Sequence, residues 1–393
     1  MPLHRNIRVL QWFNFITALR LYSAFAVVYF ARITDSYALG MAVFSIIFVS
    51  SALLEVPTGV LSDRVGRRWS LIAGTVAMLA ASIFYALPTV LTDNSAFTFL
   101  AIGAFLEGLC RSLYSGNNTA LIHDSLSQTG NEKEFSHVFG RIMSLDQVAF
   151  GLTAVVGAAL AEWNMALVMW LSVLPQIVCL LLAFQIVEPK VHIGKHDGNI
   201  YDHLKSAFAE VWRSPKLRKL TLASSWGYAF GETSWTFQAA FFSQLWPVWA
   251  IGLSKGGSGV IAAVGFHYAG RVIRKFGALR TWLIGDVFGR VIMSIIAAAF
   301  PTVLTPAIFT FVSLFHGTST VAREELLQKE YLPKQRATMG SVVSFAGSLL
   351  FAVVSFGTGL LADIYSPQVV FLGLQLLIVP SLVWMWRGRN KTT

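Results

Sequence analysis

A polar stretch, "EGLCRSLYSGNN", begins at Glu107 inside an otherwise apolar part of the chain. On a helix, Glu107 and Arg111 lie on one face because they are four residues apart, and Tyr114 and Asn118 continue that face. A carboxylate that is desolvated in one state and paired with arginine in another can take up and release a proton. We therefore predict that Glu107 and Arg111, together with Asp146, couple the uptake and release of a proton to a change between two states of the protein. A structural ion pair that neutralises itself is the alternative.

Other charged residues lie within apolar segments, where an ionisable group is costly and is a candidate for a substrate or ion path. Tyr228, Glu232 and Trp235 follow one another at helical spacing. Aromatic rings beside a carboxylate can hold an organic cation, although the same rings can also pack a helix interface. For Lys255, within "IGLSKGGSGV", close helix packing and ligand contact both stay open. The predicted substrate-binding residues are Arg20, Tyr114, Asn118, Tyr228, Glu232, Trp235, Asp286 and Arg290.

The composition indicates which elements must position these residues. Of the 393 residues, 55% are hydrophobic and only 13% are charged, and the mean hydropathy is +0.61. A soluble domain has about 25% charged residues, so the composition indicates a polytopic membrane protein. The formal net charge of +10 is spread over short segments between apolar stretches, which argues against nucleic-acid binding. Cys110 and Cys179 lie within apolar stretches and indicate neither a disulfide framework nor a metal site.

Twelve stretches are long and apolar enough to cross about 30 Å of hydrocarbon as helices. Helices are required because a backbone in lipid must satisfy its own hydrogen bonds, and the sequence has no alternating strand pattern. The sequence thus predicts an all-α integral membrane protein with twelve transmembrane helices. The predicted spans are 9–30, 39–61, 70–91, 96–121, 137–161, 165–187, 218–243, 247–269, 281–300, 303–322, 338–361 and 367–386.

The hydrophilic stretch 188–217 divides the predicted spans into two groups of six. We predict an N-terminal bundle at 1–187, a linker at 188–217 and a C-terminal bundle at 218–393. Apolar residues at helical spacing between Tyr201 and Trp212 suggest a short interfacial helix in the linker, and a plain linker is the alternative. Lysine and arginine gather in alternate turns, so the positive-inside rule predicts that both termini are cytoplasmic, in the plasma (inner) membrane.

The decapeptide "GVLSDRVGRR", between the second and third predicted spans, carries four charges. Six plus six spans, a central linker and this charged turn together resemble the major facilitator superfamily. The decapeptide is similar to the superfamily's signature, G-x-L-x-D-R-x-G-R-[RK], which lies between its second and third helices. The matching positions are Gly59, Leu61, Asp63, Arg64, Gly66, Arg67 and Arg68.

The resemblance implies that this turn is a latch, which closes the cytoplasmic side while the protein opens outward. It implies that Asp63 faces the start of the eleventh helix, near 337–340, and that a charge relay reaches an acid at the end of the fourth helix, here Asp124. Glu55 and Pro57 lie just before the turn, and we predict that they shape the gate. The alternative is a positively charged topology signal, which would require neither Asp63 nor the glycines.

The resemblance further implies a secondary active transporter that works by alternating access, in which the two bundles rock about a site near the membrane midplane. The leading hypothesis is proton-coupled export of small, partly hydrophobic organic molecules, although the fifth span, "AFGLTAVVGAALAE", lacks the proline of the family's antiporter signature. The first alternative is proton-coupled uptake of a polar or anionic metabolite, with Arg20, Arg111 and Arg290 as anion partners. The second is a non-transporting receptor or scaffold.

The sequence contains no nucleotide-binding loop, no nucleophile–base spacing and no metal cluster, so we expect neither an enzyme nor a cofactor. The proton gradient is the expected driving force. The expected partners are a small-molecule substrate, protons and the lipid bilayer, and we expect the chain to act as a monomer.

Overall fold

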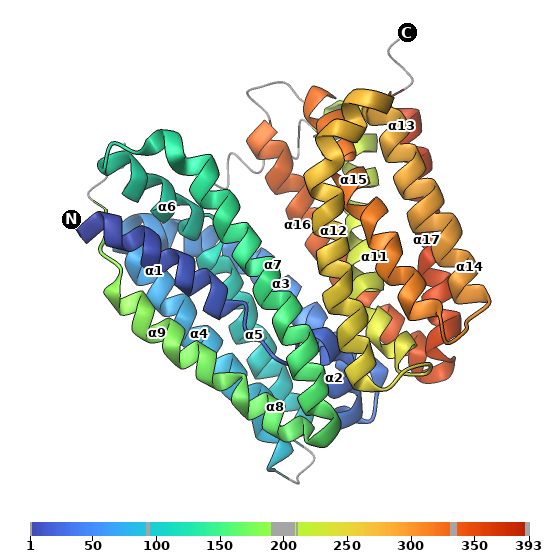
Figure 1. The fold of residues 1–393 in the computed structure, drawn as a ribbon, viewed down its shortest axis with the longest axis horizontal. Helices are drawn as coiled ribbons and strands as arrows, with labels where there is room; N and C mark the ends of the chain where they lie inside the picture. Colours follow the sequence, from blue (N-terminus) through green and yellow to red (C-terminus); the bar gives the residue numbers. More distant parts are fainter. Residues whose placement is uncertain (1, 92–94, 190–208, 210, 331–335, 390–393) are drawn as a thin grey trace. The chain divides into compact units, whose positions relative to one another are not determined.

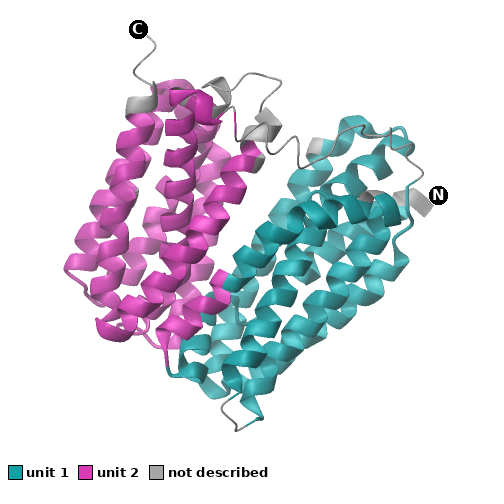
Figure 2. Cartoon of the chain, turned by 180° about the vertical axis from the view of Figure 1, so that it is seen from behind, with its two compact units in different colours: residues 1–35, 46–197 teal, residues 36–45, 198–393 magenta. Residues whose placement is uncertain are grey.

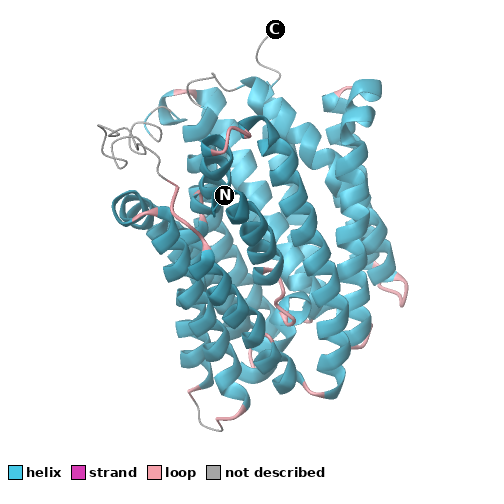
Figure 3. Cartoon of the chain, turned by 60° about the vertical axis from the view of Figure 1, so that its left-hand side comes forward, coloured by secondary structure: helices cyan, strands magenta, loops and turns pink. Residues whose placement is uncertain are grey.

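The computed structural model describes residues 2–91, 95–189, 209, 211–330 and 336–389. Within these ranges the chain forms helices joined by short loops, and no strand (Figures 1 and 3). It divides into two compact units (Figure 2): unit 1 comprises residues 1–35 and 46–197, and unit 2 comprises residues 36–45 and 198–393. The first turns of α3 (Tyr37–Val65) therefore group with unit 2, while the rest of this helix belongs to unit 1.

The helices of unit 1 share an apolar core, to which α1, α4, α6, α7 and α9 contribute. Leu10, Phe13, Leu71, Leu121 and Cys179 are fully buried in it. The helices of this unit, besides α3, are α1 (Pro2–Thr17), η1 (Ser23–Phe25), α2 (Ala26–Thr34), α4 (Arg67–Ala86), η2 (Leu87–Thr89), α5 (Ala96–Tyr114), α6 (Asn117–Gln128), η3 (Glu132–Glu134), α7 (Phe135–Trp163), α8 (Met165–Leu171) and α9 (Val173–Gln185).

Unit 2 has a core of its own, built from α11, α13, α15, α16 and α17. Leu220, Trp282, Ala322, Val342 and Met385 are buried there. The helices are α11 (Pro215–Phe242), α12 (Val248–Phe276), α13 (Ala278–Leu283), the π-helix η4 (Ile284–Met293), α14 (Ser294–Ala299), α15 (Thr305–Glu330), α16 (Arg336–Ile364) and α17 (Pro367–Arg389). The predicted interfacial helix between Tyr201 and Trp212 lies for most of its length outside the described residues.

Within the described ranges, nine helical segments are long and apolar enough to cross a membrane. They include α3, α4, α12 and α16, and they correspond to nine of the predicted spans. Many large apolar side chains on the helices are exposed, among them Trp163 at 87% and Val353 at 71%. Such side chains are suited to contact with lipid, and the chain is a multi-pass membrane protein.

Predicted spans 9–30, 218–243 and 303–322 are the three that these nine segments do not include. The second and third fall on α11 and α15, which are helical but more polar than α3, α4, α12 and α16. Twelve crossings therefore stay a prediction.

The first predicted span is not one continuous helix, and in this respect the sequence-based prediction is wrong. Helix α1 ends at Thr17, and helical structure resumes only at Ser23. On α7, Gly157 packs so closely on the intervening backbone that an added Cβ would collide with the carbonyl group of Leu21. The close approach is open only to glycine, which fixes the interrupted segment against α7.

The predicted span 96–121 is also divided. Helix α5 ends at Tyr114, Gly116 adopts a φ of +73°, and α6 begins at Asn117. Such a φ is in the left-handed region, which glycine occupies without steric cost. The polar face that was predicted to run from Glu107 to Asn118 is therefore shared between two helices.

Candidate functional site

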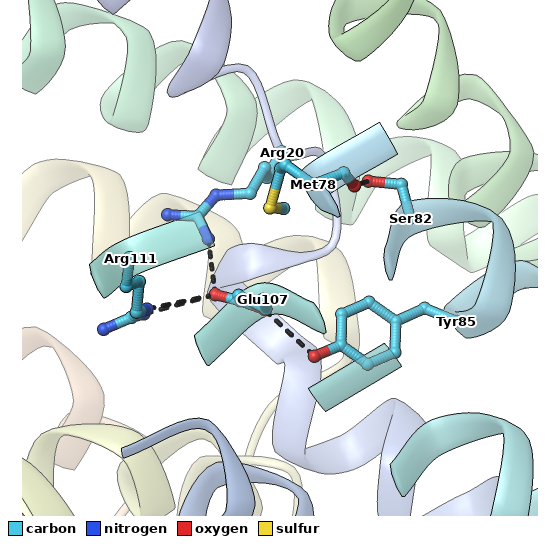
Figure 4. Close-up of polar contacts among 6 residues, drawn as sticks. All are labelled: Arg20, Met78, Ser82, Tyr85, Glu107 and Arg111. Carbon is cyan, nitrogen blue, oxygen red and sulfur yellow. Dashed lines mark hydrogen bonds and ion pairs between the residues drawn. The ribbon is translucent and has the colours of Figure 1, made fainter. Parts of the chain in front are cut away.

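A group of charges in unit 1 surrounds Glu107 on α5, whose side chain is almost completely buried (Figure 4). Arg20 Nη1 donates to Glu107 Oε1 at 2.8 Å, and Arg111 Nη2 lies 3.3 Å from the same oxygen. Tyr85, from the end of α4, donates its hydroxyl proton to Glu107 Oε2 at 3.0 Å. Three separate elements thus converge on one carboxylate.

The interruption between α1 and α2 positions Arg20. Its backbone lies in the segment 18–22, where the regular i to i+4 hydrogen bonds of a helix give way to shorter turns. In membrane proteins, non-helical backbone at membrane depth is tolerated where protein buries it or where it lines a cavity, and discontinuous helices form the ion and substrate sites of many transporters. The guanidinium group of Arg20 is about one third exposed, so it remains accessible while it pairs with Glu107.

The charges around Glu107 are nearly balanced. Arg20 and Arg111 contribute two positive charges to one carboxylate, and Asp146 on α7 attracts Arg20 from a greater distance. Arg111 is more exposed than Arg20, and its guanidinium carbon lies 5.0 Å from the ring centroid of Phe48. If Glu107 took up a proton, both ion pairs would be lost at once, so the arrangement responds strongly to its protonation.

Helix α4 forms the less polar side of this site. Met78 lies beside the charges in Figure 4, and its carbonyl oxygen accepts a hydrogen bond of 3.0 Å from the Ser82 hydroxyl. The hydroxyl of Ser82 is therefore used within its own helix, which leaves Tyr85 as the polar group that α4 directs at Glu107.

A second buried charge, Lys255 on α12, lies in unit 2, and its side chain is only 3% exposed. Its Nζ donates to the backbone carbonyl of Trp235 at 2.5 Å and lies 3.6 Å from the centroid of the Trp235 ring. Glu232, on the same helix as Trp235, attracts the ammonium charge. Tyr228 is one turn further along α11, and its ring packs on the backbone of α16 at Gly347.

Asp286 is a third buried charge, located in the π-helix of unit 2. It accepts hydrogen bonds from Trp282 Nε1 at 2.8 Å and from the Ser319 hydroxyl at 2.7 Å. Asp286 also lines a small cavity of about 10 Å³, together with Gly227, Arg323 and six further residues from α11, α13 and α17. Isolated π-helical segments frequently occur at functional sites.

The charged turn of the decapeptide contains a glycine that its backbone requires. Gly66, between α3 and α4, adopts a backbone φ of +100°, which residues other than glycine rarely adopt. Glu188 accepts hydrogen bonds from the backbone amides of Arg67 at 2.9 Å and Arg68 at 2.7 Å. A carboxylate on free amides at a helix N-terminus is favoured by the helix dipole. The Arg67 side chain forms an ion pair with Asp124 on α6.

The sequence matches the Major Facilitator Superfamily over residues 9–322. The chain belongs to this superfamily. Its members are transporters, so the protein is a membrane transporter and not an enzyme. No curated protein sequence matches the chain significantly.

Solved structures of other transporters have the same fold. The nucleoside transporter NupG matches with a TM-score of 0.78 at 15% identity, over 100% of both chains. A D-xylose-proton symporter matches with a TM-score of 0.74 at 14% identity, over 98% of each chain. A POT family transporter in complex with 5-aminolevulinic acid matches with a TM-score of 0.72 at 13% identity, over 99% of this chain and 97% of that one.

Two residues predicted for the substrate cavity, Tyr114 and Asn118, have uncharged partners. Tyr114 packs its ring against Phe13 and shares a hydrogen bond of 2.8 Å with the hydroxyl of Thr75. Asn118 bonds with Asn14 on α1. Both side chains join helices in the interior of unit 1.

The signature residues of the superfamily are described only in part. The side chains of Asp63 and Arg290 lie outside the described residues, as do those of 337–339 at the start of α16. Arg64 is exposed, and a Cβ added at Gly59 would meet no described atom within 4 Å.

The two residues predicted to shape the gate have different surroundings. Glu55 is exposed and accepts a hydrogen bond of 3.2 Å from the Ser115 hydroxyl, at the point where α5 ends. Helix α3 continues through Pro57, which lies inside it. Glu55 thus links α3 to the break between α5 and α6.

Several partners were missed by the sequence analysis: Tyr85, Glu188, Trp282 and Ser319. Tyr85, Glu188 and Ser319 are distant along the chain from their partners, so no local spacing indicates them. Trp282 lies four residues before Asp286, and this helical spacing could have indicated the contact. Among the described residues, no group of three His, Cys, Asp or Glu side chains is arranged to hold a metal ion.

Proposed function

We propose that this chain is a proton-coupled transporter that exports small, amphipathic organic molecules by alternating access. The observation that carries the proposal is the position of Glu107, buried between Arg20 and Arg111 at an interrupted helix. When Glu107 is charged, it holds the segment that carries Arg20 against α5. When it is protonated, that attraction is lost, so the proton and the position of the segment are linked.

The proton gradient is large enough for this task. One proton that moves through about 100 mV supplies about 2.3 kcal/mol, which supports a substrate gradient of about fiftyfold. The same network has a role for Asp146, which attracts Arg20 from α7 and is positioned to compete for it when Glu107 is neutral. The proposed proton-coupling residues are therefore Glu107, Arg111 and Asp146, with Arg20 as the residue that changes partners.

Uptake of an anionic metabolite is the second candidate function, and one observation favours it. Two guanidinium groups converge on the single oxygen Glu107 Oε1, and both remain partly exposed. A carboxylate or phosphate group is a good partner for such a pair when Glu107 is protonated. In that case the proton and the substrate would move in the same direction.

The turn at Gly66 is proposed as part of the cytoplasmic gate. The pairing of Arg67 with Asp124 and the contact of Glu188 with α4 support a rigid turn, as a latch requires. The distribution of lysine and arginine supports cytoplasmic termini in the plasma (inner) membrane. Labelling of single cysteines placed near residues 64 and 387 in intact cells would contradict this orientation if an impermeant reagent reached them.

The purified full-length chain, reconstituted in vesicles with a trapped pH indicator, tests the proposal. We expect that organic cations and anions from a mixed panel include at least one that drives proton movement. Movement opposite to that of the substrate supports export by exchange, and movement in the same direction supports the uptake alternative. Glu107→Gln should abolish the coupled proton movement, whereas the exposed control Glu162→Gln on α7 should retain it. Substrate-driven proton movement that persists in Glu107→Gln would refute the proposed site.

A further inference from the structure

The ammonium group of Lys255 lies against the aromatic and acidic residues of α11 that were predicted to bind an organic cation. Lys255 reaches from α12 to the ring of Trp235, with its Nζ 3.6 Å from the ring centroid. Glu232 supplies the attracting negative charge. A cation over a tryptophan ring near a carboxylate is the arrangement by which proteins recognise organic ammonium ions. The side chain of Lys255 therefore occupies the position expected for a cationic substrate.

The protein offers Lys255 few other partners. An ammonium group has three N–H donors, and one of them is used by the Trp235 carbonyl at 2.5 Å. The side chain is 3% exposed, so water compensates little of its charge. The carboxylate of Glu232 and the ring of Trp235 thus carry most of the stabilisation of this buried charge.

Other elements of unit 2 bring no described charge to this position. Helix α15 packs along α12 here through uncharged groups, because the Ser254 hydroxyl donates to the Pro306 carbonyl at 2.9 Å and contacts the Thr310 hydroxyl. The nearest titratable residue of α15 is His316, whose ring packs on Phe266, three turns of α12 beyond Lys255. Helix α13 packs at the opposite end of α12 and carries Arg280. Glu232 is therefore the charge that sets the state of Lys255 from α11.

The ring that Lys255 contacts remains accessible on part of its surface. Trp235 is 37% exposed, and Tyr228, two turns away along α11, is 39% exposed. A molecule can therefore approach this group while the lysine is in place. One carboxylate balances one positive charge, and two cations on the same ring and carboxylate would repel each other in a site with little water.

We propose that Lys255 is a built-in competitor for a monovalent organic cation, and that such a cation displaces the proton of Lys255 when it binds to Trp235 and Glu232. The charges balance: the site begins with carboxylate and ammonium, gains one cation, and releases one proton to solvent from the ammonium group. Lys255 remains as a neutral amine. This inference rests on the proposed export function and assigns to it a substrate class and an exchange residue.

Binding of tetraphenylphosphonium, a monovalent aromatic cation, to the purified full-length chain tests the inference. Proton release is measured in weakly buffered detergent solution, and affinity is measured by equilibrium dialysis between pH 6 and about pH 9. For the wild-type chain we expect proton release on cation binding and an affinity that rises by up to about tenfold per pH unit while Lys255 is an ammonium group in the free protein. The affinity should level off at higher pH, where the amine is already neutral and no proton is exchanged. Lys255→Met should bind the cation with no proton release and with an affinity independent of pH.

Two further variants keep the test decisive. Lys255→Arg retains a permanent positive charge, because a guanidinium group keeps its proton, and it should bind the cation at least tenfold more weakly than Lys255→Met. Lys275→Met, at the exposed end of the same helix, should behave like the wild-type chain. Thermal unfolding of each variant shows that it is folded, and Lys255→Arg carries the test if Lys255→Met is unstable.

The outcomes separate this inference from the proposed function. The inference is overturned if Lys255→Met fails to bind the cation, releases protons as the wild-type chain does, or binds it no better than Lys255→Arg. If other substrates still drive proton movement through Glu107 in that event, the proposed function stands without it. Conversely, proton release that depends on Lys255 but is accompanied by no transport would support the inference and refute the proposed function.

Discussion

In unit 1 the buried carboxylate Glu107 is balanced by two guanidinium groups, whereas in unit 2 the buried carboxylate Asp286 is held by an indole N–H and a hydroxyl group. The first arrangement balances charge with charge, and the second satisfies charge with neutral dipoles. Replacement of the carboxylate by an uncharged amide therefore has different consequences for stability in the two units. Neutral donors can bond to an amide as well as to a carboxylate, but two guanidinium groups that lose their carboxylate are costly.

The comparison extends to the backbone that carries these groups. Arg20 lies where helical structure is interrupted, while Asp286 lies in a continuous π-helix between α13 and α14. An interrupted segment can move with little change in the helices on either side, whereas the π-helix is packed against α15 at Gly285 and Gly289. The difference suggests that unit 1 holds the responsive site and that Asp286 fixes helix packing.

The largest expected effect is on the stability of unit 1. We expect that Glu107→Gln lowers the free energy of unfolding by about 3–5 kcal/mol, because it leaves Arg20 and Arg111 without their carboxylate. Asp286→Asn should cost less than half as much, because its two donors keep an acceptor. Thermal and denaturant unfolding in detergent measure both variants.

A double variant sharpens this prediction. Arg20→Gln combined with Glu107→Gln removes one of the unpaired charges, so part of the lost stability should return. Equal losses for Glu107→Gln and Asp286→Asn would show that the two carboxylates are held alike, and the contrast between the units would then be wrong.

The sequence alone predicts the chemistry of the Glu107 site better than its architecture. The four-residue spacing of Glu107 and Arg111 predicts their ion pair, and the pair is present. Arg20 was predicted as a cavity residue, but its pairing with Glu107 depends on the break at 18–22, which contains neither glycine nor proline. Gly157, which packs closely on that break, lies on a helix that begins more than a hundred residues later.

Unit 2 shows the same limit. The sequence predicts that Tyr228, Glu232 and Trp235 lie along one helix and that their chemistry suits a cation. It does not reveal that Lys255 provides such a cation, because helical periodicity describes one helix and says nothing of the side chain that a neighbour inserts. The alternative prediction, that these aromatic rings pack between helices, fits Tyr228, whose ring packs against α16 at Gly347.

An intermediate effect is expected at the contact that positions Arg20. Gly157→Ala must push back the backbone of Leu21, and such overpacking costs about 1–3 kcal/mol. Because that backbone carries Arg20, we also expect a several-fold fall in proton-coupled transport, measured as the initial rate in vesicles. Gly140→Ala, on the same helix, is the matched control, because its added Cβ meets no described atom within 4 Å. A transport rate for Gly157→Ala equal to that of Gly140→Ala would separate the break from the function of the Glu107 site.

The smallest effect is expected at the turns that precede α4 and α13, where the two units differ again. Gly66 and Gly277 both have positive φ values, of +100° and +78°, so both turns use glycine in the same way. In unit 1 Glu188 accepts from the amides of Arg67 and Arg68, and in the described part of unit 2 no carboxylate contacts the first amides of α13.

We expect that Glu188→Gln costs about 0.3–1 kcal/mol, because the glutamine keeps one acceptor but loses the charge that favours a helix N-terminus. Hydrogen exchange measured by mass spectrometry should show faster exchange in peptides that cover Arg67 and Arg68, and unchanged exchange around Gly277. Glu162→Gln, which is exposed on α7, should change neither region. Unchanged exchange at Arg67 and Arg68 would mean that the carboxylate adds nothing to the turn. In that event both units would hold this turn by the glycine alone, and the rigidity of the proposed gate would depend on the pairing of Arg67 with Asp124.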